Sequence, residues 1–476
     1  MNTVESKIIS DTIDQALRAE KAVRDMTRQK QRKILVLGQS ESGKSTLIKQ
    51  FRLLHSAETF SAERQSWKSI VYLNIIRSIW KVIEILSSRF NLTNPTDVES
   101  QNFARLRLRL MPLRSVELSI VKSLSSPREV AQTWSNGPNN GRGSPGIGMN
   151  KEYEYEDVVV HPDSIWQRLR QRCLYNTSTS KAGTSLSIEH EEVRETDDPS
   201  RTLEVCATDM KKLWSCPVAR QYLKKTGLFI EEISGFFLND IERITSPGYI
   251  PTDDDILRTR VKTIRPTETI LTCRESGVEW KIYDVGGARR QRAKWAPFFD
   301  DVDSLVVMAP VSAFDQVLSE DPSVNRLKDS FDMWRELCNT TILHKIPVLL
   351  FLNKIDLLEK KLHEGVKLSK YLVSYGDRPN DFKSVLQFLH ARFLRLRTES
   401  KAPNLAPCYV HHTSLVVRIH LDLLGLSFEY KAGSSDYTNY CRACTGQGGW
   451  PLHTIVNITN GEHQIAMEYL ENSYMV

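Results

Sequence analysis

Residues 38–46 limit what this chain can fold into more than any other stretch. They read Gly-Gln-Ser-Glu-Ser-Gly-Lys-Ser-Thr, which matches the spacing G-x-x-x-x-G-K-S. An apolar run, 34–37, precedes the stretch, and a helix-compatible run, 47–51, follows it. This order predicts a strand, a phosphate-binding loop and a helix, because the loop N–H groups and the positive end of the helix both attract phosphate oxygens. We expect Lys44 to reach the β- and γ-phosphates and the Ser45 hydroxyl to bind Mg²⁺.

The length and charge of the chain narrow its class. Its 476 residues leave room for two or three domains. The 64 basic and 58 acidic residues leave a net charge of +6 with no concentrated run, so we expect no nucleic-acid partner. Eight scattered cysteines indicate reduced thiols and a cytoplasmic compartment. The most apolar segment, 70–86, is not expected to span a membrane, because polar side chains interrupt it at Asn74, Arg77, Lys81 and Glu84.

The pattern of apolar residues divides the chain into two kinds of structure. After residue 251, short apolar runs alternate with helical segments at 280–285, 304–311 and 346–352, which is typical of buried parallel strands. Residues 61–250 are helical in pattern, with one apolar stripe at Ile76, Ile79, Trp80, Ile83 and Leu86. Because the phosphate loop lies before this helical block, we expect the block to be inserted into an α/β domain.

The predicted organisation has five parts. Residues 1–30 form an N-terminal amphipathic helix, 31–60 and 251–416 form the two parts of the α/β domain, 61–250 form the helical domain, and 417–476 form an atypical C-terminal segment. Within the helical domain, residues of about 135–205 are rich in Gly, Ser, Asn and acidic side chains. Such a composition buries too little apolar surface to offset the entropy of ordering, so we predict mobile insertions there.

Three further motifs are expected near the carboxyl ends of the strands, where open α/β sheets bind ligands. In Asp284-Val-Gly-Gly287, the carboxylate can reach Mg²⁺ through water, and Gly287 can bring its N–H to a γ-phosphate. In Asn353-Lys-Ile-Asp356, a carboxylate can accept both N1–H and the exocyclic amine of guanine, a donor pair that adenine lacks. Residues 257–263 supply cations and a hydroxyl where the helical block ends.

With these motifs in this order, the chain resembles the α subunits of heterotrimeric G proteins over about residues 5–416. The longest matching stretches are 35–50, 249–263, 284–295 and 350–358. The resemblance implies a Ras-like P-loop GTPase domain of the α/β class with an inserted all-helical domain, and GDP or GTP bound between the two. It also implies a switch that couples a G-protein-coupled receptor to effectors and binds a beta-gamma dimer in its GDP form.

The resemblance assigns roles to individual residues. Arg260 matches the arginine that stabilises charge on the γ-phosphoryl group, a role taken from the family. Mg²⁺ would be held by Ser45 and Thr263, with Asp284 acting through water. The residues implied to bind the nucleotide are Glu41, Ser42, Gly43, Lys44, Ser45, Thr46, Leu257, Arg258, Thr263, Asp284, Gly287, Asn353, Lys354, Asp356 and Leu415. Lys294 and Trp295 resemble the family's contact with beta-gamma.

Two departures from the family bear on hydrolysis. Ala288 stands where the family has a glutamine that orients the attacking water, and Ser40 replaces a glycine of the phosphate loop. Losing one preorganised polar group from such a site typically lowers the rate about 10²- to 10³-fold. We therefore expect GTP binding with a low intrinsic rate of hydrolysis. Compensation by Gln39 or Gln291 is the alternative for the chemistry, and a GTP-locked scaffold that binds an effector or beta-gamma without cycling is the alternative for the function.

The two ends of the chain also depart from the family. Residues 408–416 match its last strand, but nothing beyond Val416 resembles its receptor-contacting helix, so receptor coupling is less expected. The segment after Val416 is either an atypical end or the product of reading through a splice junction. Cys441 and Cys444 have zinc-ligand spacing, yet the nearby histidines do not fit a finger. Because Met1 is followed by Asn2, we expect no myristoylation, and we expect peripheral residence at the inner face of the plasma membrane through partners.

Overall fold

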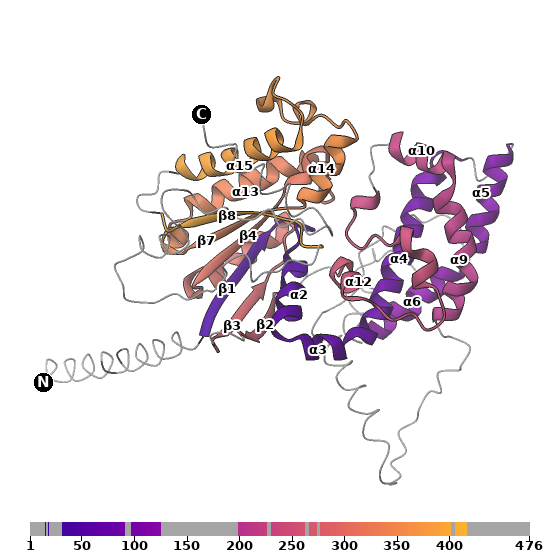
Figure 1. Cartoon of the computed structure of the whole chain (residues 1–476), viewed down its shortest axis with the longest axis horizontal. Coiled ribbons are helices and arrows are strands. Elements are labelled where there is room, and N and C mark those ends of the chain that lie inside the picture. Colours follow the sequence, from indigo (N-terminus) through magenta and orange to yellow (C-terminus); the bar gives the residue numbers. More distant parts are fainter. Residues whose placement is uncertain are drawn as a thin grey trace, which may run out of the picture. The chain divides into compact units, whose positions relative to one another are not determined.

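The computed structural model describes residues 31–90, 97–124, 199–225, 230–261, 266–273, 277–400 and 405–416, together with Gln15 and Arg18 (Figure 1). These residues form two compact units. The first contains the described residues up to Ala57 and from Glu268 onward, and the second runs from Glu58 to Thr267. Most of the predicted N-terminal helix, most of the predicted insertions at 135–205 and the segment 417–476 lie outside the described residues.

A six-stranded sheet forms the centre of the first unit. Its strands are β1 (Gln31–Gly38), β2 (Thr267–Thr272), β3 (Glu279–Asp284), β4 (Ser304–Pro310), β7 (Val348–Asn353) and β8 (Cys408–Thr413), in the spatial order β2-β3-β1-β4-β7-β8. The pairs β1–β3, β1–β4, β4–β7 and β7–β8 are all parallel. Every residue of β4 and β7 is buried, as expected for parallel strands covered on both faces.

Helices cover both faces of this sheet, and β1 shows how its alternating side chains serve two cores. Leu35 and Leu37 belong to a core with α13 (Arg326–Asn339), α14 (Ile355–His363) and α15 (Phe382–Thr398). Ile34 and Val36 belong to a second core with α2 (Lys44–His55). Figure 1 shows these helices on opposite sides of the strands. The period of two along a strand accounts for this division.

Shorter elements complete the first unit. They are η5 (Arg289–Asp301), η6 (Val311–Asp315), β5 (Val317–Leu318), β6 (Asp321–Asn325), η7 (Thr341–Lys345), η8 (Leu368–Lys370) and η9 (Val373–Tyr375). The strands β5 and β6 pair antiparallel as a separate two-stranded sheet. The register of the main sheet pairs Val36 with Asp284 and Asn353 with Thr413. The carboxyl ends of the strands therefore meet at one edge, which carries Asp284, Asn353 and the phosphate loop.

The second unit consists of helices. Its elements are α3 (Ala57–Ala62), η1 (Arg64–Ser66), α4 (Trp67–Ser87), α5 (Val98–Arg109), α6 (Pro112–Leu124), α9 (Pro199–Ser215), α10 (Pro217–Lys225), η3 (Ile230–Glu232), η4 (Leu238–Asp240), α11 (Ile241–Ile244) and α12 (Asp253–Arg258). The long helix α4 packs against α6, α9 and α10. All five residues of the apolar stripe predicted on α4 are buried, which confirms that the stripe faces the core.

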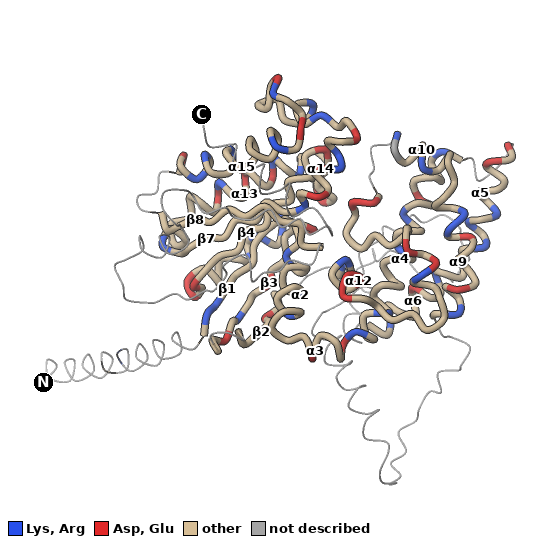
Figure 2. Tube along the Cα trace, viewed as in Figure 1, with Lys and Arg blue, Asp and Glu red and all other residues tan. Residues whose placement is uncertain are grey.

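The surface of the described residues is charged and mixed. Figure 2 shows Lys and Arg interspersed with Asp and Glu along the helices of both units. Within the described ranges, none of the helices has both the length and the apolar character that crossing a bilayer requires.

Candidate functional site

The phosphate loop connects the end of β1 to the start of α2. Gly43 precedes α2 with a φ of 107°, a conformation that side chains with a Cβ rarely adopt. A Cβ built on Gly43 would lie 2.3 Å from Asn353 Nδ2. The Lys44 ammonium folds back over the loop and donates to the carbonyls of Gly38, at 3.0 Å, and Gln39, at 2.7 Å. Burial lowers the pKa of Lys44 to about 8, and the nearby Asp284 carboxylate opposes this shift.

A hydroxyl and a carboxylate meet at the predicted metal position. Ser45 Oγ donates to Asp284 Oδ2 at 2.7 Å. Oxygen ligands of these two types are the kind that Mg²⁺ takes in nucleotide sites. The Ser42 side chain is fully buried, and among the described residues its hydroxyl has no hydrogen-bond partner. A buried hydroxyl in this condition fits a site whose ligand supplies the missing partner.

Gly287 lies directly against the phosphate loop. A Cβ at this position would be 2.3 Å from the Gly38 carbonyl oxygen and 2.4 Å from the carbonyl carbon of Gln39. Only a glycine permits this close approach of two backbone segments. The structure therefore brings together the phosphate loop, Ser45, Asp284 and Gly287, four predicted parts that are up to about 250 residues apart in the sequence.

Asn353 connects the phosphate loop to the end of β8. Its Nδ2 donates to the Ser42 carbonyl at 2.8 Å, and its Oδ1 accepts from Thr413 Oγ1 at 3.2 Å and from the Leu415 N–H at 3.4 Å. Leu415 is among the residues that the resemblance implies to bind the nucleotide, and its N–H is bonded to Asn353 in this structure. Asn353 acts here as a support that fixes the position of neighbouring segments.

Asp356 lies in the first turn of α14, three residues after Asn353. Lys354, which precedes α14, has a positive φ of 67°, so the chain turns sharply between β7 and the helix. The Asp356 side chain is half-buried. Within the described part of the chain, no hydrogen bond or ion pair involves its carboxylate, so both oxygens are available to a purine base.

A buried ion pair that the sequence did not reveal anchors α14. Lys361 donates to the Ser312 carbonyl at 2.8 Å and to Asp315 Oδ1 at 2.5 Å, both in η6. The two side chains are 1% and 4% exposed. The element η6 directly follows β4, and α14 follows β7. The ion pair therefore fixes α14, the helix that carries Asp356, to the segment after β4.

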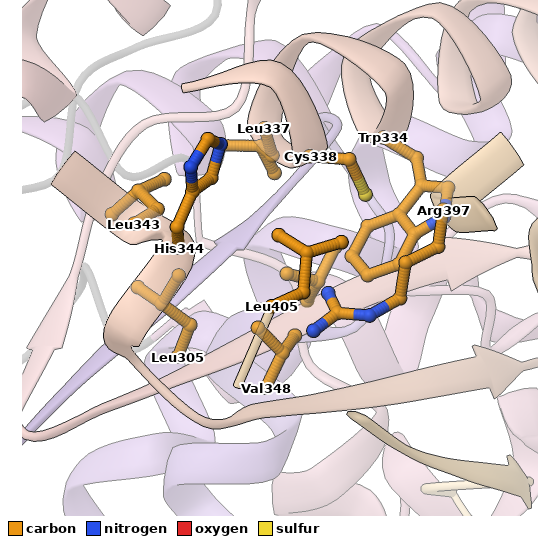
Figure 3. Close-up of a pocket in the computed structure, with 10 residues that line it drawn as sticks. Leu305, Trp334, Leu337, Cys338, Leu343, His344, Val348, Arg397 and Leu405 are labelled. Atoms are coloured by element: carbon orange, nitrogen blue, oxygen red, sulfur yellow. The ribbon is translucent and has the colours of Figure 1, made fainter. Parts of the chain in front are cut away.

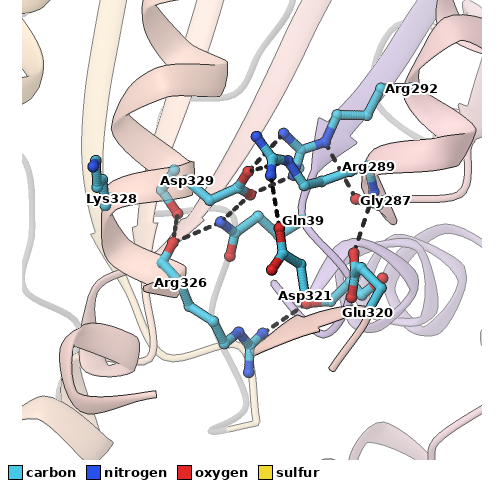
Figure 4. A network of polar contacts seen from close by, with 12 residues as sticks. Gln39, Gly287, Arg289, Arg292, Glu320, Asp321, Arg326, Lys328 and Asp329 are labelled. Atoms are coloured by element: carbon cyan, nitrogen blue, oxygen red, sulfur yellow. Dashed lines mark hydrogen bonds and ion pairs between the residues drawn. The ribbon is translucent and has the colours of Figure 1, made fainter. Parts of the chain in front are cut away.

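A polar network connects the segment after Gly287 to the phosphate loop and α13 (Figure 4). Arg292 donates to both oxygens of Asp329, and its Nε donates to the Gly287 carbonyl at 3.5 Å. Gln39 Nε2 donates to Asp329 Oδ2 at 2.5 Å and to the Arg326 carbonyl at 2.6 Å. The Arg326 guanidinium donates to the Ser40 carbonyl at 2.7 Å. The Asp329 carboxylate therefore accepts both from Arg292, in the segment after Gly287, and from Gln39 of the phosphate loop.

Ala288 stands where the family has a glutamine that orients the attacking water, so the side chains near it bear on hydrolysis. Ala288 is half-buried and directly precedes η5. The Gln291 side chain lies against Gly286, where a Cβ would be 2.2 Å from Gln291 Oε1. Trp295, predicted to contact beta-gamma, is 3% exposed and its indole N–H donates to the Gly286 carbonyl at 2.9 Å, whereas Lys294 is exposed.

Four predicted site residues belong to the second unit, and three of them lie among the described residues. Leu257 is buried in α12. The Arg258 guanidinium is engaged in ion pairs with Asp240 and Asp255, both at 3.0 Å. The backbone of Arg260 bonds to Asn74 of α4, at 2.7 Å through its N–H and 3.0 Å through its carbonyl. Thr263 lies outside the described residues.

A small pocket lies at the other edge of the sheet (Figure 3). Leu305 and Val348, which line it, stand near the first residues of β4 and β7, opposite the carboxyl ends that gather the site. Most of the lining is apolar, with Trp334, Cys338, His344 and Arg397 around it. We assign it no part in nucleotide binding.

Comparison with known proteins agrees with this geometry. The family described as G-protein alpha subunit matches residues 7–420. The guanine nucleotide-binding protein alpha-4 subunit of Mycosarcoma maydis is 32% identical over 437 residues, covering 76% of this chain and 74% of the relative. The alpha-1 subunit of Saccharomyces cerevisiae is 27% identical over 438 residues, covering 86% and 90%. The subunit alpha of Candida albicans is 27% identical over 416 residues, covering 86% and 89%.

The match covers most of the chain and includes both units and all four motifs. The fold is a Ras-like α/β domain with an inserted helical domain. The chain belongs to the family of G-protein alpha subunits.

Proposed function

We propose that this chain is a guanine-nucleotide switch of the heterotrimeric type, with a low intrinsic rate of GTP hydrolysis. The observation that carries the proposal is the gathering of the phosphate loop, the Ser45–Asp284 pair and the Asn353–Asp356 segment at one edge of one sheet. Each part has the chemistry for one part of the ligand. The loop suits phosphates, the hydroxyl and carboxylate suit Mg²⁺, and Asp356 suits guanine.

Different residues of the site would contact the phosphates, the metal ion and the base. Lys44 and the N–H groups at the start of α2 neutralise phosphate charge, and Ser45 with Asp284 would hold the metal. Mg²⁺ held by these two residues would supply positive charge that offsets the charge of the phosphates. Asn353 keeps the loop and the end of β8 in register, and Asp356 selects guanine over adenine. By family resemblance, Arg260 would stabilise charge on the γ-phosphoryl group, and Thr263 would help to hold Mg²⁺.

Slow hydrolysis is proposed from the side chains near Ala288. A methyl group can neither accept nor donate a hydrogen bond, so it cannot orient a water molecule. The Gln39 amide nitrogen already donates to Arg326 and Asp329, in a fully buried position. The Gln39 amide nitrogen could take part in hydrolysis only by breaking both hydrogen bonds. This arrangement supports a long-lived GTP form.

Single-turnover hydrolysis on the purified full-length chain tests the proposal. We expect Ala288→Gln to hydrolyse bound GTP about 10²- to 10³-fold faster than the unaltered protein. Ala293→Gln places the same side chain at an exposed position of η5 and serves as the matched control, with an unaltered rate. Equal rates for the unaltered protein and Ala288→Gln would refute impaired hydrolysis.

A GTP-locked scaffold that binds an effector or beta-gamma without cycling is the second candidate. The network around Asp329 favours it, because Arg292 and Gln39 both donate to Asp329 and so hold the segment after Gly287 near the phosphate loop. The nucleotide on protein purified from its own cells separates the two. GDP indicates a cycling switch, and GTP indicates the locked form.

The proposed partners follow from the family. They are a beta-gamma dimer and a G-protein-coupled receptor, with location at the inner face of the plasma membrane through these partners. Lys294 is exposed and accessible to beta-gamma, whereas the Trp295 indole would have to leave its buried position to take part. Co-purification with beta-gamma, in GDP and in a non-hydrolysable GTP analogue, tests this pairing.

A further inference from the structure

Asn74 is a polar residue in the middle of the apolar helix α4. Its side chain is 5% exposed and its neighbours in the helix, Leu73 and Ile75, are buried. Burying an amide without hydrogen-bond partners is costly, so the partners of such a residue are informative. Both polar atoms of the Asn74 amide bond to the same residue, Arg260, which lies 186 positions further along the chain.

The two hydrogen bonds form a clasp on the Arg260 backbone. Asn74 Oδ1 accepts from the Arg260 N–H at 2.7 Å, and Asn74 Nδ2 donates to the Arg260 carbonyl at 3.0 Å. Because these groups lie on either side of the Arg260 Cα, the clasp restrains the peptide planes that flank it. The direction in which the arginine side chain leaves the backbone is therefore set by a residue of α4.

Gly235 makes room for the clasp. It has a φ of 83°, and a Cβ there would lie 2.7 Å from Asn74 Oδ1 and 3.0 Å from Arg260 Cβ. The Gly235 N–H donates to the Arg258 carbonyl at 3.1 Å. The backbone of residues 258–260 is thus held by α4 on one side and by the Gly235 turn on the other, directly after α12 ends.

We propose that Asn74 is a positioning residue for Arg260, which it holds in the orientation needed to stabilise charge on the transferred phosphoryl group. The inference rests on the proposed function, because it assumes that Arg260 acts on GTP. A purely structural role would make Asn74 a satisfied buried amide that stabilises the helical unit. The two roles differ in one respect, which is whether an Asn74 substitution has any effect on hydrolysis when Arg260 is absent.

The experiment is a double-mutant cycle in the Ala288→Gln full-length protein, which gives a measurable single-turnover rate. Asn74→Leu, of similar size, removes both hydrogen bonds, and Asn74→Asp removes the donor to the Arg260 carbonyl. Asn102→Leu, at an exposed position of α5 in the same unit, is the matched control. GTP binding and thermal unfolding are measured for each variant, so that losses of affinity or folding are separated from losses of rate.

We expect Asn74→Leu to lower the hydrolysis rate about 10- to 100-fold, the effect of misplacing a catalytic group by roughly 1 Å, with GTP affinity changed less than about threefold. Asn102→Leu leaves the rate unchanged. In the Arg260→Ala protein, neither Asn74 variant lowers the rate further, because the group that Asn74 positions is gone. If Asn74→Leu does not fold, Asn74→Asp must show the same dependence on Arg260.

Three results would overturn the inference while leaving GTP binding intact. They are Asn74 variants with the rate of their parent, losses that multiply with Arg260→Ala, and a rate that does not depend on Arg260. A folded protein that takes up no GTP would overturn the proposed function, and the inference with it.

Discussion

Gly43 affects two parts of the candidate nucleotide site, the phosphate loop and the segment at Asn353. It starts α2 in a left-handed conformation, and its Cα faces the Asn353 amide that links the phosphate loop to β8. Any side chain there meets two separate penalties. The first is backbone strain of about 1–2 kcal/mol, and the second is displacement of Asn353.

Substitution of Gly43 separates these two penalties. Gly43→Ala is expected to weaken GTP binding at least about tenfold, because the new methyl group pushes Asn353 away from the Ser42 carbonyl. Gly365→Ala is the matched control, since Gly365 has a φ of 82° with nothing within 4 Å of its Cβ position. The Gly365→Ala variant therefore has the backbone strain without a steric contact, and we expect it to keep its GTP affinity. Titration of both variants with GTP measures the two affinities. Equal affinity in the two variants would show that the contact with Asn353 is unimportant.

Single residues also show what the sequence could and could not reveal. The positions of Lys44, Ser45 and Asp284 at one edge of the sheet were predictable, because their motifs are short and local and follow strands. Asn74 was visible only as an interruption of an apolar helix. Its partner lies 186 positions away, and no period or motif connects the two. Gln39 likewise reads as a possible catalytic amide until the structure places it against Asp329.

At the scale of elements, a buried ion pair between Lys361 and Asp315 joins α14 to η6. Both side chains are almost fully buried, and both bond to groups of η6 or α14. A buried pair of this kind stabilises little by itself, but removing one partner leaves an uncompensated charge in the core.

Variants of this pair have a defined order of stability. Lys361→Met and Asp315→Leu should each destabilise the α/β unit by about 3–5 kcal/mol, measured by denaturant unfolding. The double variant should lose less than the sum of the two, because neither charge is then left alone. Additive losses would mean that the two side chains act independently.

A second contact between elements makes stability depend on pH. His390 of α15 and His412 of β8 meet at 2.9 Å between Nδ1 and Nε2. Burial lowers the pKa of His412 from 6.5 to about 4, with His390 and His411 adding to the shift, and burial also lowers the pKa of His390. Both rings are therefore held neutral in the folded state.

The direction of the pH effect follows from these shifts. The unfolded chain binds protons on His412 as the pH falls below about 6.5, whereas the folded chain resists protonation until about pH 4. We expect full stability from this contact above pH 6.5 and a loss between pH 6.5 and 4. His412→Phe should reduce the slope of unfolding free energy in this window by up to about 1.4 kcal/mol per pH unit. An unchanged slope, from denaturant unfolding at several pH values, would argue against buried neutral histidines.

At the scale of the whole molecule, the division into two units explains which predictions succeeded. An inserted helical domain was predictable because the phosphate loop precedes the helical block while the remaining strands follow it. The α/β unit was predictable because β4 and β7 are continuous apolar runs, as doubly covered parallel strands require. The network around Asp329 was not predictable, because it depends on how α13, the phosphate loop and η5 pack in three dimensions.

The central claim is that one edge of the α/β sheet binds a guanine nucleotide with Mg²⁺. Isothermal titration of the full-length chain, freed of nucleotide, with GTP in the presence of Mg²⁺ tests it most directly. The account predicts one GTP site per chain that GDP occupies and ATP does not, and that Asp356→Ala weakens. A folded chain that takes up no guanine nucleotide, or that takes up ATP as well as GTP, would contradict it.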